Sequence, residues 1–327
     1  ETMDNESYSK LLNDFLVQYP NSMEGYIRRA NLNMLGVDAG KYTLAEEDLK
    51  KAMEVATNKS ECNYQVAKSI YGYLLSLGDK EPHTAWTYEK ALELVRNAIQ
   101  MENQPLHIQL EGDILFAQGN YADAFTSYNK VNQSELASAA TFYSACKAKQ
   151  LMEGSDMNEV LALMDSAIVK LNKPYMDEAA PYFYERAELR AQAGKFKEAV
   201  MDYNTFHDAV LGKVTALFYF QREQAEMQCR MYQQALNDIN KGGGMAPEDV
   251  DFWVVKGSVH LRVNQLDEAI AAFNKAISMN NQYAAAYRML GYCQAMQKKN
   301  KEACANFAKA KELGDEVVDQ LIEKFCK

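Results

Sequence analysis

A short apolar pattern recurs along the chain, and its spacing leaves little choice of fold. A typical copy starts with an aromatic residue or Leu, has Ala three residues later, a large apolar residue four further on, and usually a small residue three beyond that. Spacings of three and four place these residues on one side of an α-helix. Because the copies follow one another at a near-constant interval, the sequence predicts a helical solenoid of repeated units. The copies begin at Tyr42, Tyr88, Tyr121, Phe196, Tyr232, Leu266 and Asn300.

The last two units show the repeat most clearly. Trp253 and Gly257 stand four residues apart, and Tyr287 and Gly291 repeat this spacing 34 residues later. A small residue at the second of these places lets the backbones of two paired helices approach closely. The pattern resembles the tetratricopeptide repeat family, whose unit is a helix-turn-helix of this length. The resemblance implies an all-α, right-handed superhelical solenoid of antiparallel helix pairs.

This register divides the chain into three parts. Residues 1–22 are expected to form a single N-terminal helix, residues 23–315 about eight units in one continuous solenoid, and residues 316–327 a capping helix. The units begin near residues 23, 57, 105, 135, 180, 216, 250 and 284. In the cap, Val317, Leu321, Ile322 and Phe325 are expected to share the face that covers the apolar side of the last repeat.

Some places depart from the pattern. Glu223 stands where other units have Gly or Ala, so either the register slips there or the first helix packs differently. Residues 172–181, which include two prolines, and residues 242–244, which are three glycines, are predicted to bend the superhelix. A bend is preferred to a domain boundary because helical pattern resumes at once on both sides.

The charge of the chain limits its partners. The formal net charge of −10 over 327 residues opposes non-specific binding to nucleic acid and to anionic lipid, and weakly suggests a basic partner. No apolar run reaches the length of a membrane span, so the chain as given is expected to be soluble. Its first residue is Glu1 rather than Met. The compartment is left open, and a mature extracytoplasmic form whose leader has been removed is one alternative.

Residues with catalytic or metal-binding potential do not form a recognisable site. Ser144 and Lys147 make a Ser-x-x-Lys pair, but the Lys-Thr-Gly and Ser-Asp-Asn segments of serine-lysine hydrolases are absent. The four histidines lack the spacing of metal ligands. The sequence therefore predicts no enzyme activity, no cofactor and no metal site. The six cysteines are expected to be mostly small buried residues, with a disulfide such as Cys293 to Cys304 as the alternative.

The resemblance also implies a binding surface, because the first helices of such repeats line a concave groove that holds an extended peptide or a partner helix. Transferred to this sequence, the partner-binding residues are Ile27, Asn31, Gln109, Asp113, Phe116, Tyr184, Glu188, Phe220, Gln224, Arg288 and Tyr292. Met34, Met227, Val254, Ser258 and Leu261 fall on the same faces. This mixture suits a hydrophobic segment with some hydrogen bonding.

The chain is therefore interpreted as a non-catalytic scaffold that binds a protein or peptide of unidentified sequence. The alternative is a carbohydrate-binding component that resembles the helical nutrient-uptake lipoproteins. Those proteins usually carry long insertions between repeats, whereas the insertions in this chain are short.

Overall fold

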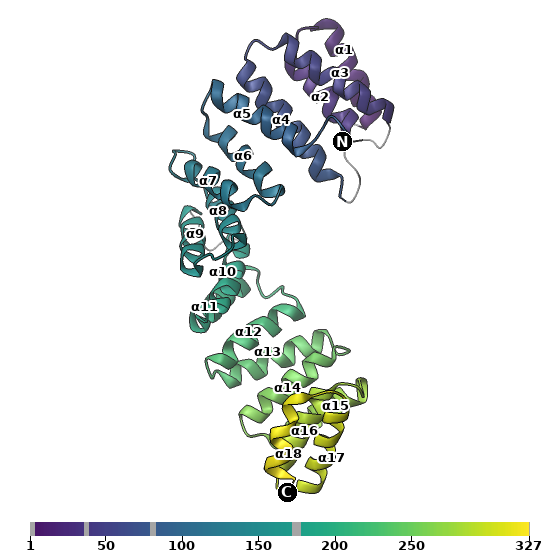
Figure 1. Cartoon of the computed structure of the whole chain (residues 1–327), viewed down its shortest axis with the longest axis vertical. Coiled ribbons are helices and arrows are strands. Elements are labelled where there is room, and N and C mark those ends of the chain that lie inside the picture. The colour runs from purple at the N-terminus through teal and green to yellow at the C-terminus, as the bar shows by residue number, and fades with distance from the viewer. Residues whose placement is uncertain (1–3, 36–38, 79–82, 172–177, 327) are drawn as a thin grey trace. The chain divides into compact units, whose positions relative to one another are not determined.

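The protein is built from helices throughout its described length. The structure, a computed structural model, describes residues 4–35, 39–78, 83–171 and 178–326. These residues form eighteen α-helices and one short 3₁₀-helix, and no strand lies among them (Figure 1). The helices gather into two compact units, Glu1–Asn172 and Lys173–Lys327. Residues 172–177 of the expected bend lie outside the described residues, and the single continuous solenoid stays a prediction.

The N-terminal unit consists of one single helix and four helix pairs. Its helices are α1 (Asn5–Gln18), α2 (Met23–Met34), α3 (Ala39–Val55), α4 (Lys59–Ser76), α5 (Tyr88–Met101), α6 (Pro105–Ala117), α7 (Tyr121–Asn132), α8 (Ala139–Leu151) and α9 (Met157–Lys170). The pairs α2/α3, α4/α5, α6/α7 and α8/α9 pack closely. They match the unit starts predicted near residues 23, 57, 105 and 135.

The C-terminal unit has four further pairs and a closing segment. Its helices are α10 (Ala180–Gln192), α11 (Phe196–Ala209), α12 (Ala216–Gln228), α13 (Tyr232–Met245), α14 (Val250–Arg262), α15 (Leu266–Met279), α16 (Ala284–Met296), α17 (Asn300–Glu312), the 3₁₀-helix η1 (Glu316–Val318) and α18 (Asp319–Phe325). The pairs are α10/α11, α12/α13, α14/α15 and α16/α17. The predicted all-α class of stacked helix pairs is confirmed.

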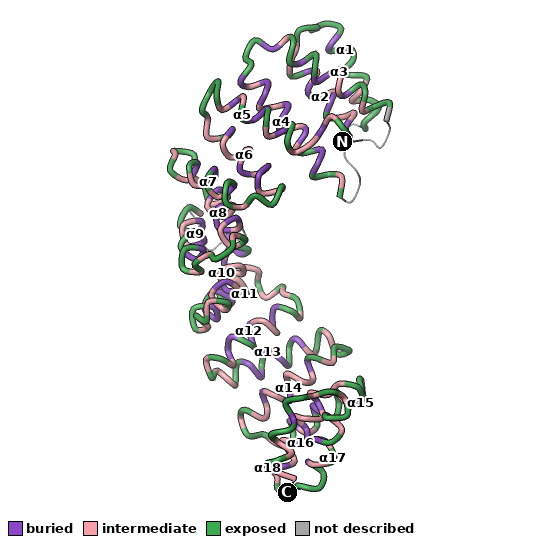
Figure 2. Tube along the Cα trace, in the orientation of Figure 1, coloured by how far each residue is buried: buried purple, intermediate pink, exposed green. Residues whose placement is uncertain are grey.

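Small residues in the first helices face aromatic rings of the second helices. A Cβ atom added to Gly112 would lie 2.8 Å from the ring of Tyr128, and one added to Gly257 would lie 2.7 Å from the ring of Phe273. Ala269, on the second helix of the same pair as Gly257, is fully buried. The close helix crossing expected from the sequence is therefore confirmed, and Figure 2 shows buried positions along the inner sides of the pairs.

Glu223 does not shift the register of its unit. Helices α12 and α13 pack as the other pairs do, and Ala235 on α13 is fully buried as its counterparts are. The place that Phe273 occupies in the next unit is held here by Ile239, which is smaller. The register is therefore kept, and α12 packs with a buried carboxyl group in place of a glycine.

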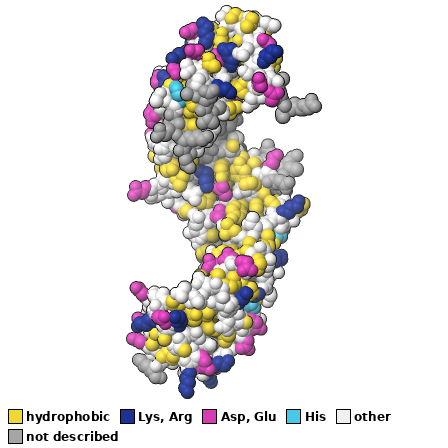
Figure 3. Space-filling model, turned by 90° about the vertical axis from the view of Figure 1, so that its right-hand side faces the viewer, with side chains coloured by type: hydrophobic (Ala, Val, Ile, Leu, Met, Phe, Trp, Pro, Cys, Tyr) yellow, Lys and Arg dark blue, Asp and Glu magenta, His cyan; other side chains and the backbone are white. Residues whose placement is uncertain are grey.

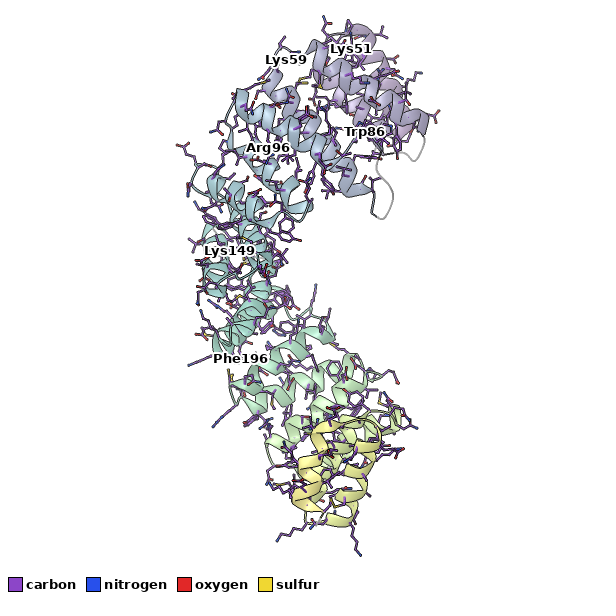
Figure 4. All side chains as sticks on the ribbon, viewed as in Figure 1. Lys51, Lys59, Trp86, Arg96, Lys149 and Phe196 are labelled. Atoms are coloured by element: carbon purple, nitrogen blue, oxygen red, sulfur yellow. A yellow bond between two sulfur atoms is a disulfide. The ribbon has the colours of Figure 1, made fainter. Side chains whose placement is uncertain are left out.

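An aromatic cluster stabilises the core of the N-terminal unit before α5. Trp86 is buried inside this unit (Figure 4). Its ring centroid lies 4.9 Å from that of Tyr73, 5.5 Å from that of Tyr42 and 4.6 Å from that of His83. The cluster joins residues of α3, α4 and the chain before α5, so it holds two consecutive helix pairs together.

Buried ion pairs join the two helices in three of the pairs. In each, an Arg of the first helix donates two hydrogen bonds, 2.6 to 2.9 Å long, to both carboxylate oxygens of an Asp on the second helix. Such bidentate pairs fix geometry as well as charge. The pairs are Arg29 with Asp48, Arg186 with Asp202, and Arg222 with Asp238. The apolar pattern gave no indication of them.

The prediction of a bend at Gly242 to Gly244 is wrong, because these three glycines lie within helix α13. A Cβ atom on Gly242 would lie 2.6 Å from the ring of Phe252 and 3.2 Å from Cβ of Tyr219. The glycine is therefore needed where α14 and α12 approach α13, rather than for a turn.

Alanine substitutions at two of these glycines are expected to have opposite effects. Gly242→Ala should lower the free energy of unfolding by about 1–2 kcal/mol, because the ring of Phe252 must move. Gly244→Ala should raise it by about 0.5–1 kcal/mol, because nothing lies within 4 Å of the new Cβ and alanine favours a helix. Urea unfolding of both variants measures the difference, and equal effects would contradict the close approach at Gly242.

The closing segment is linked covalently to the last pair. A disulfide joins Cys304 on α17 to Cys326, directly after α18. The alternative pairing of Cys293 with Cys304 is wrong, since Cys293 is a buried free thiol. The four cysteines that remain free include three that are buried, as expected of small core residues.

The cap presents a face that differs from the predicted one in one residue. Leu321, Ile322 and Phe325 pack on the last pair as expected, but Val317 is 64% exposed and Val318 is fully buried in its place. The segment starts as a 3₁₀-helix with three residues per turn, which shifts the phase of the residues before α18.

Candidate functional site: a groove in the C-terminal unit

A groove within the C-terminal unit runs across the first helices of three consecutive pairs. It has a volume of about 630 Å³. Five of its lining residues occupy places at which the sequence predicted groove residues, and they come from α12, α14 and α16. Those five are Met227, Ser258, Leu261, Arg288 and Tyr292. The remaining residues are Arg262, Asn264, Met289, Met296, Val317, Gln320 and Leu321.

The walls of the groove are mainly apolar, with two cationic side chains. Three methionines supply flexible thioether side chains that can adapt to different apolar surfaces. Arg288 donates from Nε to Oδ2 of Asp315 at 2.6 Å, which fixes its guanidinium beside the cap. Arg262 is exposed in the last turn of α14. On the face drawn in Figure 3, hydrophobic side chains gather over the C-terminal unit with charged side chains around them.

The cap forms one wall of this groove. Val317, Gln320 and Leu321 line it, and Phe325 places its ring 6.3 Å from that of Tyr292. Helix α18 has seven residues, none of them fully buried. Because so short a helix is unstable alone, its position depends on packing, the Cys304–Cys326 disulfide and the Arg288–Asp315 pair.

The N-terminal unit has a smaller groove between α2 and α4. It has a volume of about 330 Å³, and its lining includes Asn31, a predicted groove residue, beside Met34. The opposite wall is polar, with Gln65, Lys68 and Ser69. Asn31 and Met34 therefore both line this groove. Ile27, by contrast, is 3% exposed and packs in the core of the unit, so its assignment to the binding surface is wrong.

Tyr184 and Glu188 meet through a residue that the sequence reasoning missed. The hydroxyl of Tyr184 donates to Oε1 of Gln221, and Nε2 of Gln221 donates to Oε1 of Glu188 at 2.7 Å. Gln221 belongs to α12 and the other two belong to α10, so the network crosses from one helix pair to the next. It orients two predicted groove residues of α10 and links the α10/α11 pair to the α12/α13 pair.

Four further predicted residues lie half-buried in contacts between helices. The hydroxyl of Tyr128 donates a hydrogen bond to Oδ1 of Asp113 at 2.8 Å. Burial raises the pKa of the Asp113 carboxyl group. The ring of Phe220 lies 5.7 Å from that of Phe252 in the next pair, and that of Phe116 lies 5.3 Å from Tyr121. Gln109 is half-buried, and Gln224 is exposed on α12. Asp113, Phe116 and Phe220 were predicted to face a partner, but in the structure they also pack between helices.

Two carboxyl groups of α12 are buried close to an ion pair. Glu223 is 2% exposed and Glu226 is 3% exposed, and Oε2 of each lacks a hydrogen-bond partner among the described residues. The pKa of each group is raised to about 8, mainly by burial; the charges of Glu226 and Asp238 contribute at Glu223, and the charge of Asp238 contributes at Glu226. Arg222 lowers the pKa of Glu226 but is itself bound to Asp238. Near neutral pH both groups therefore retain protons.

Some residues that line the main groove occupy regular places in the repeat, although those places are not among the predicted groove positions. Arg262 and Met296 occupy the thirteenth place of consecutive units, one beyond the last place taken as groove-facing. Met289 occupies the sixth place of its unit. Val317 and Gln320 come from the cap, and repeat periodicity says nothing about a segment that is not a repeat.

Other kinds of site are not found in the described part of the chain. There, no group of three or more His, Cys, Asp or Glu side chains could hold a metal ion. Each helix described is too short or too polar to cross a lipid bilayer.

Comparison with known proteins supports the repeat assignment. Residues 232–316 match the sequence model of the tetratricopeptide repeat family. No match is found among curated proteins. The C-terminal part of a TPR repeat-containing protein from Cytophaga hutchinsonii shares the fold with a TM-score of 0.58, at 13% identity, over 77% of this chain and 96% of that chain.

Two other solved structures are similar at lower TM-scores. A tetratricopeptide repeat protein from Parabacteroides merdae aligns with 81% of this chain and 99% of its own, at 16% identity and a TM-score of 0.48. YrrB, a TPR protein with an unusual peptide-binding site, aligns with 60% of this chain and 97% of its own, at 17% identity and a TM-score of 0.49. Residues 232–316 therefore carry repeats that match the tetratricopeptide family, and stacked helix pairs of the same fold form the rest of the described length.

Proposed function

We propose that the protein is a non-catalytic scaffold that binds an extended segment of another protein in the groove of its C-terminal unit. The observation that carries the proposal is the groove itself, about 630 Å³ in volume and lined by the first helices of three consecutive pairs. Its apolar walls can bury apolar side chains of the bound segment, and its polar groups can orient that segment through hydrogen bonds.

The groove is suited to binding without large rearrangement. Its three first helices are each paired with a second helix, and the cap wall is fixed by a disulfide and an ion pair. A preformed surface loses little conformational entropy on binding, so more of the contact energy appears as affinity. This supports a scaffold that presents a surface rather than one that folds around its partner.

Photo-crosslinking from two methionine positions tests the proposal. A benzophenone amino acid at Met296, which lines the groove and is 48% exposed, is expected to label bound 12-residue peptides from a random synthetic pool. The matched control is the same amino acid at Met201, which is 62% exposed on α11 and outside the groove. Labelling at Met201 that equals or exceeds labelling at Met296 would reject the groove as the site. A glycan array on the same protein tests the carbohydrate alternative.

A further inference from the structure

The charges around the groove identify the kind of segment that it fits. We propose that the bound segment is acidic as well as apolar, with an Asp or Glu side chain at Arg262 and Arg288 and apolar side chains at the methionines. This inference rests on the proposed function of the groove.

The groove has the opposite charge to the chain as a whole. The chain carries 45 acidic and 35 basic residues, for a formal net charge of −10. The groove lining, however, includes two arginines and no Asp or Glu. The overall charge weakly favours a basic partner, but contacts in a groove are decided by the charges that line it. An acidic segment is therefore the complementary one.

Arg288 is held in place but keeps donors for a ligand. Its Nε donates to Asp315 at 2.6 Å, and one terminal nitrogen contacts the sulfur of Met289 at 3.7 Å, which is a weak hydrogen bond. A guanidinium has five N–H donors, so these two contacts leave others for a carboxylate. Asp315 offsets part of the charge of Arg288, so this residue mainly orients the bound carboxylate.

Arg262 supplies the uncompensated charge. It is exposed at the end of α14, and no hydrogen bond or ion pair is found for it among the described residues. The planar guanidinium can bind a carboxylate through two parallel hydrogen bonds. Selection for an acidic segment is thus expected to depend on Arg262 more than on Arg288.

The apolar requirement follows from the other walls. Met227, Met289 and Met296 come from α12 and α16, and Leu321 comes from the cap. Flexible thioethers accept apolar side chains of several shapes. The groove therefore selects a composition, apolar with acidic, more strictly than one sequence.

The test uses three pools of synthetic 12-residue peptides with acetylated and amidated ends, so that side chains carry the only charges. Each pool has Leu, Ile, Met and Phe at half of its positions, and either Asp and Glu, Asn and Gln, or Lys and Arg at the other half. Binding to the purified full chain is measured by fluorescence polarisation. The acidic pool is expected to bind about tenfold more tightly than the amide pool, and this ratio should fall at high ionic strength.

Two variants that each remove one positive charge test whether the preference for the acidic pool depends on Arg262. Arg262→Gln should reduce the ratio between acidic and amide pools to about threefold or less. Arg230→Gln should leave it unchanged, because Arg230 is exposed on the turn before α13 and does not line the groove.

The outcomes separate this inference from the proposed function. If the pools are crosslinked at Met296 but the amide or basic pool binds as tightly as the acidic pool, the groove binds a segment and the acidic requirement is overturned. An unchanged ratio in Arg262→Gln also overturns it. If no pool is crosslinked at Met296, the proposed function itself fails.

Discussion

Replacing Glu223 with Gln is expected to raise the free energy of unfolding at pH 8 by an amount on the order of 2–4 kcal/mol, while leaving it nearly unchanged at pH 4.5. Glu223 is 2% exposed and has a pKa raised to about 8 by burial and by the charges of Glu226 and Asp238. Glutamine has nearly the shape of the protonated acid and cannot ionise, so the variant avoids the cost of a buried negative charge.

The pH dependence of the wild-type protein has the same origin. Below about pH 4.5 the carboxyl group is protonated in both the folded and the unfolded chain, so it has no net effect. Between about pH 5 and pH 8 the unfolded chain loses this proton while the folded chain keeps it, and stability falls as pH rises. Glu226, with a pKa also raised to about 8, adds a fall in the same direction.

Urea unfolding between pH 4.5 and pH 9 measures this effect. The matched control is Glu268→Gln, which removes the same charge from an exposed position on α15. The stability curves of the wild type and Glu223→Gln should converge at low pH and separate as pH rises. Parallel curves would contradict the burial of an unpaired carboxyl group at Glu223.

Removing the Cys304–Cys326 disulfide is expected to destabilise the C-terminal cap by about 3 kcal/mol. The disulfide closes a loop with a sequence separation of 22 residues, and a loop of this length gives an entropic contribution of that size. Helix α18 has seven residues and no fully buried side chain, so the packing of Leu321, Ile322 and Phe325 alone is expected to hold it only weakly. Because Val317, Gln320 and Leu321 line the groove, peptide affinity should fall with cap stability.

Hydrogen exchange of the α18 amides, with and without a reductant, tests this expectation. The double variant Cys304→Ser with Cys326→Ser should exchange as fast as the reduced wild type and show no response to the reductant. Slow exchange in the double variant would show that packing alone keeps the cap in place.

The apolar pattern predicted the helix pairs because it records the contact that all pairs share. Gly257 and Phe273 meet at a helix crossing, and their spacing in the sequence is the spacing of that contact. The first helices of the eight pairs begin at, or within about four residues of, the unit starts that the repeat predicts. Short-range periodicity is a sufficient guide where each unit packs mainly on its neighbours.

The parts that could not be predicted are those that depend on one unit alone. Gly242 was predicted to lie in a bend, because three adjacent glycines normally favour a turn. Its place within α13, where Phe252 and Tyr219 leave no room for a side chain, depends on contacts of this unit alone. Ile27 was assigned to a surface by its place in the repeat, yet the neighbouring helices of its own unit bury it. The partner of Cys304 depended on how the cap returns to α17, and no repeat describes that path.

The Arg–Asp pairs have a mechanical consequence. The Arg–Asp contacts of Arg29, Arg186 and Arg222 each join the two helices of a single pair. Contacts of these side chains outside the pair include single hydrogen bonds, such as that from Arg222 to Asn204 on α11. Removing one partner of a buried pair of this kind costs about 3–5 kcal/mol, whereas apolar contacts are non-directional and do not fix one geometry. We therefore expect a bulky ligand to be accommodated by small rotations between neighbouring helix pairs, while the geometry within each ion-paired helix pair stays unchanged.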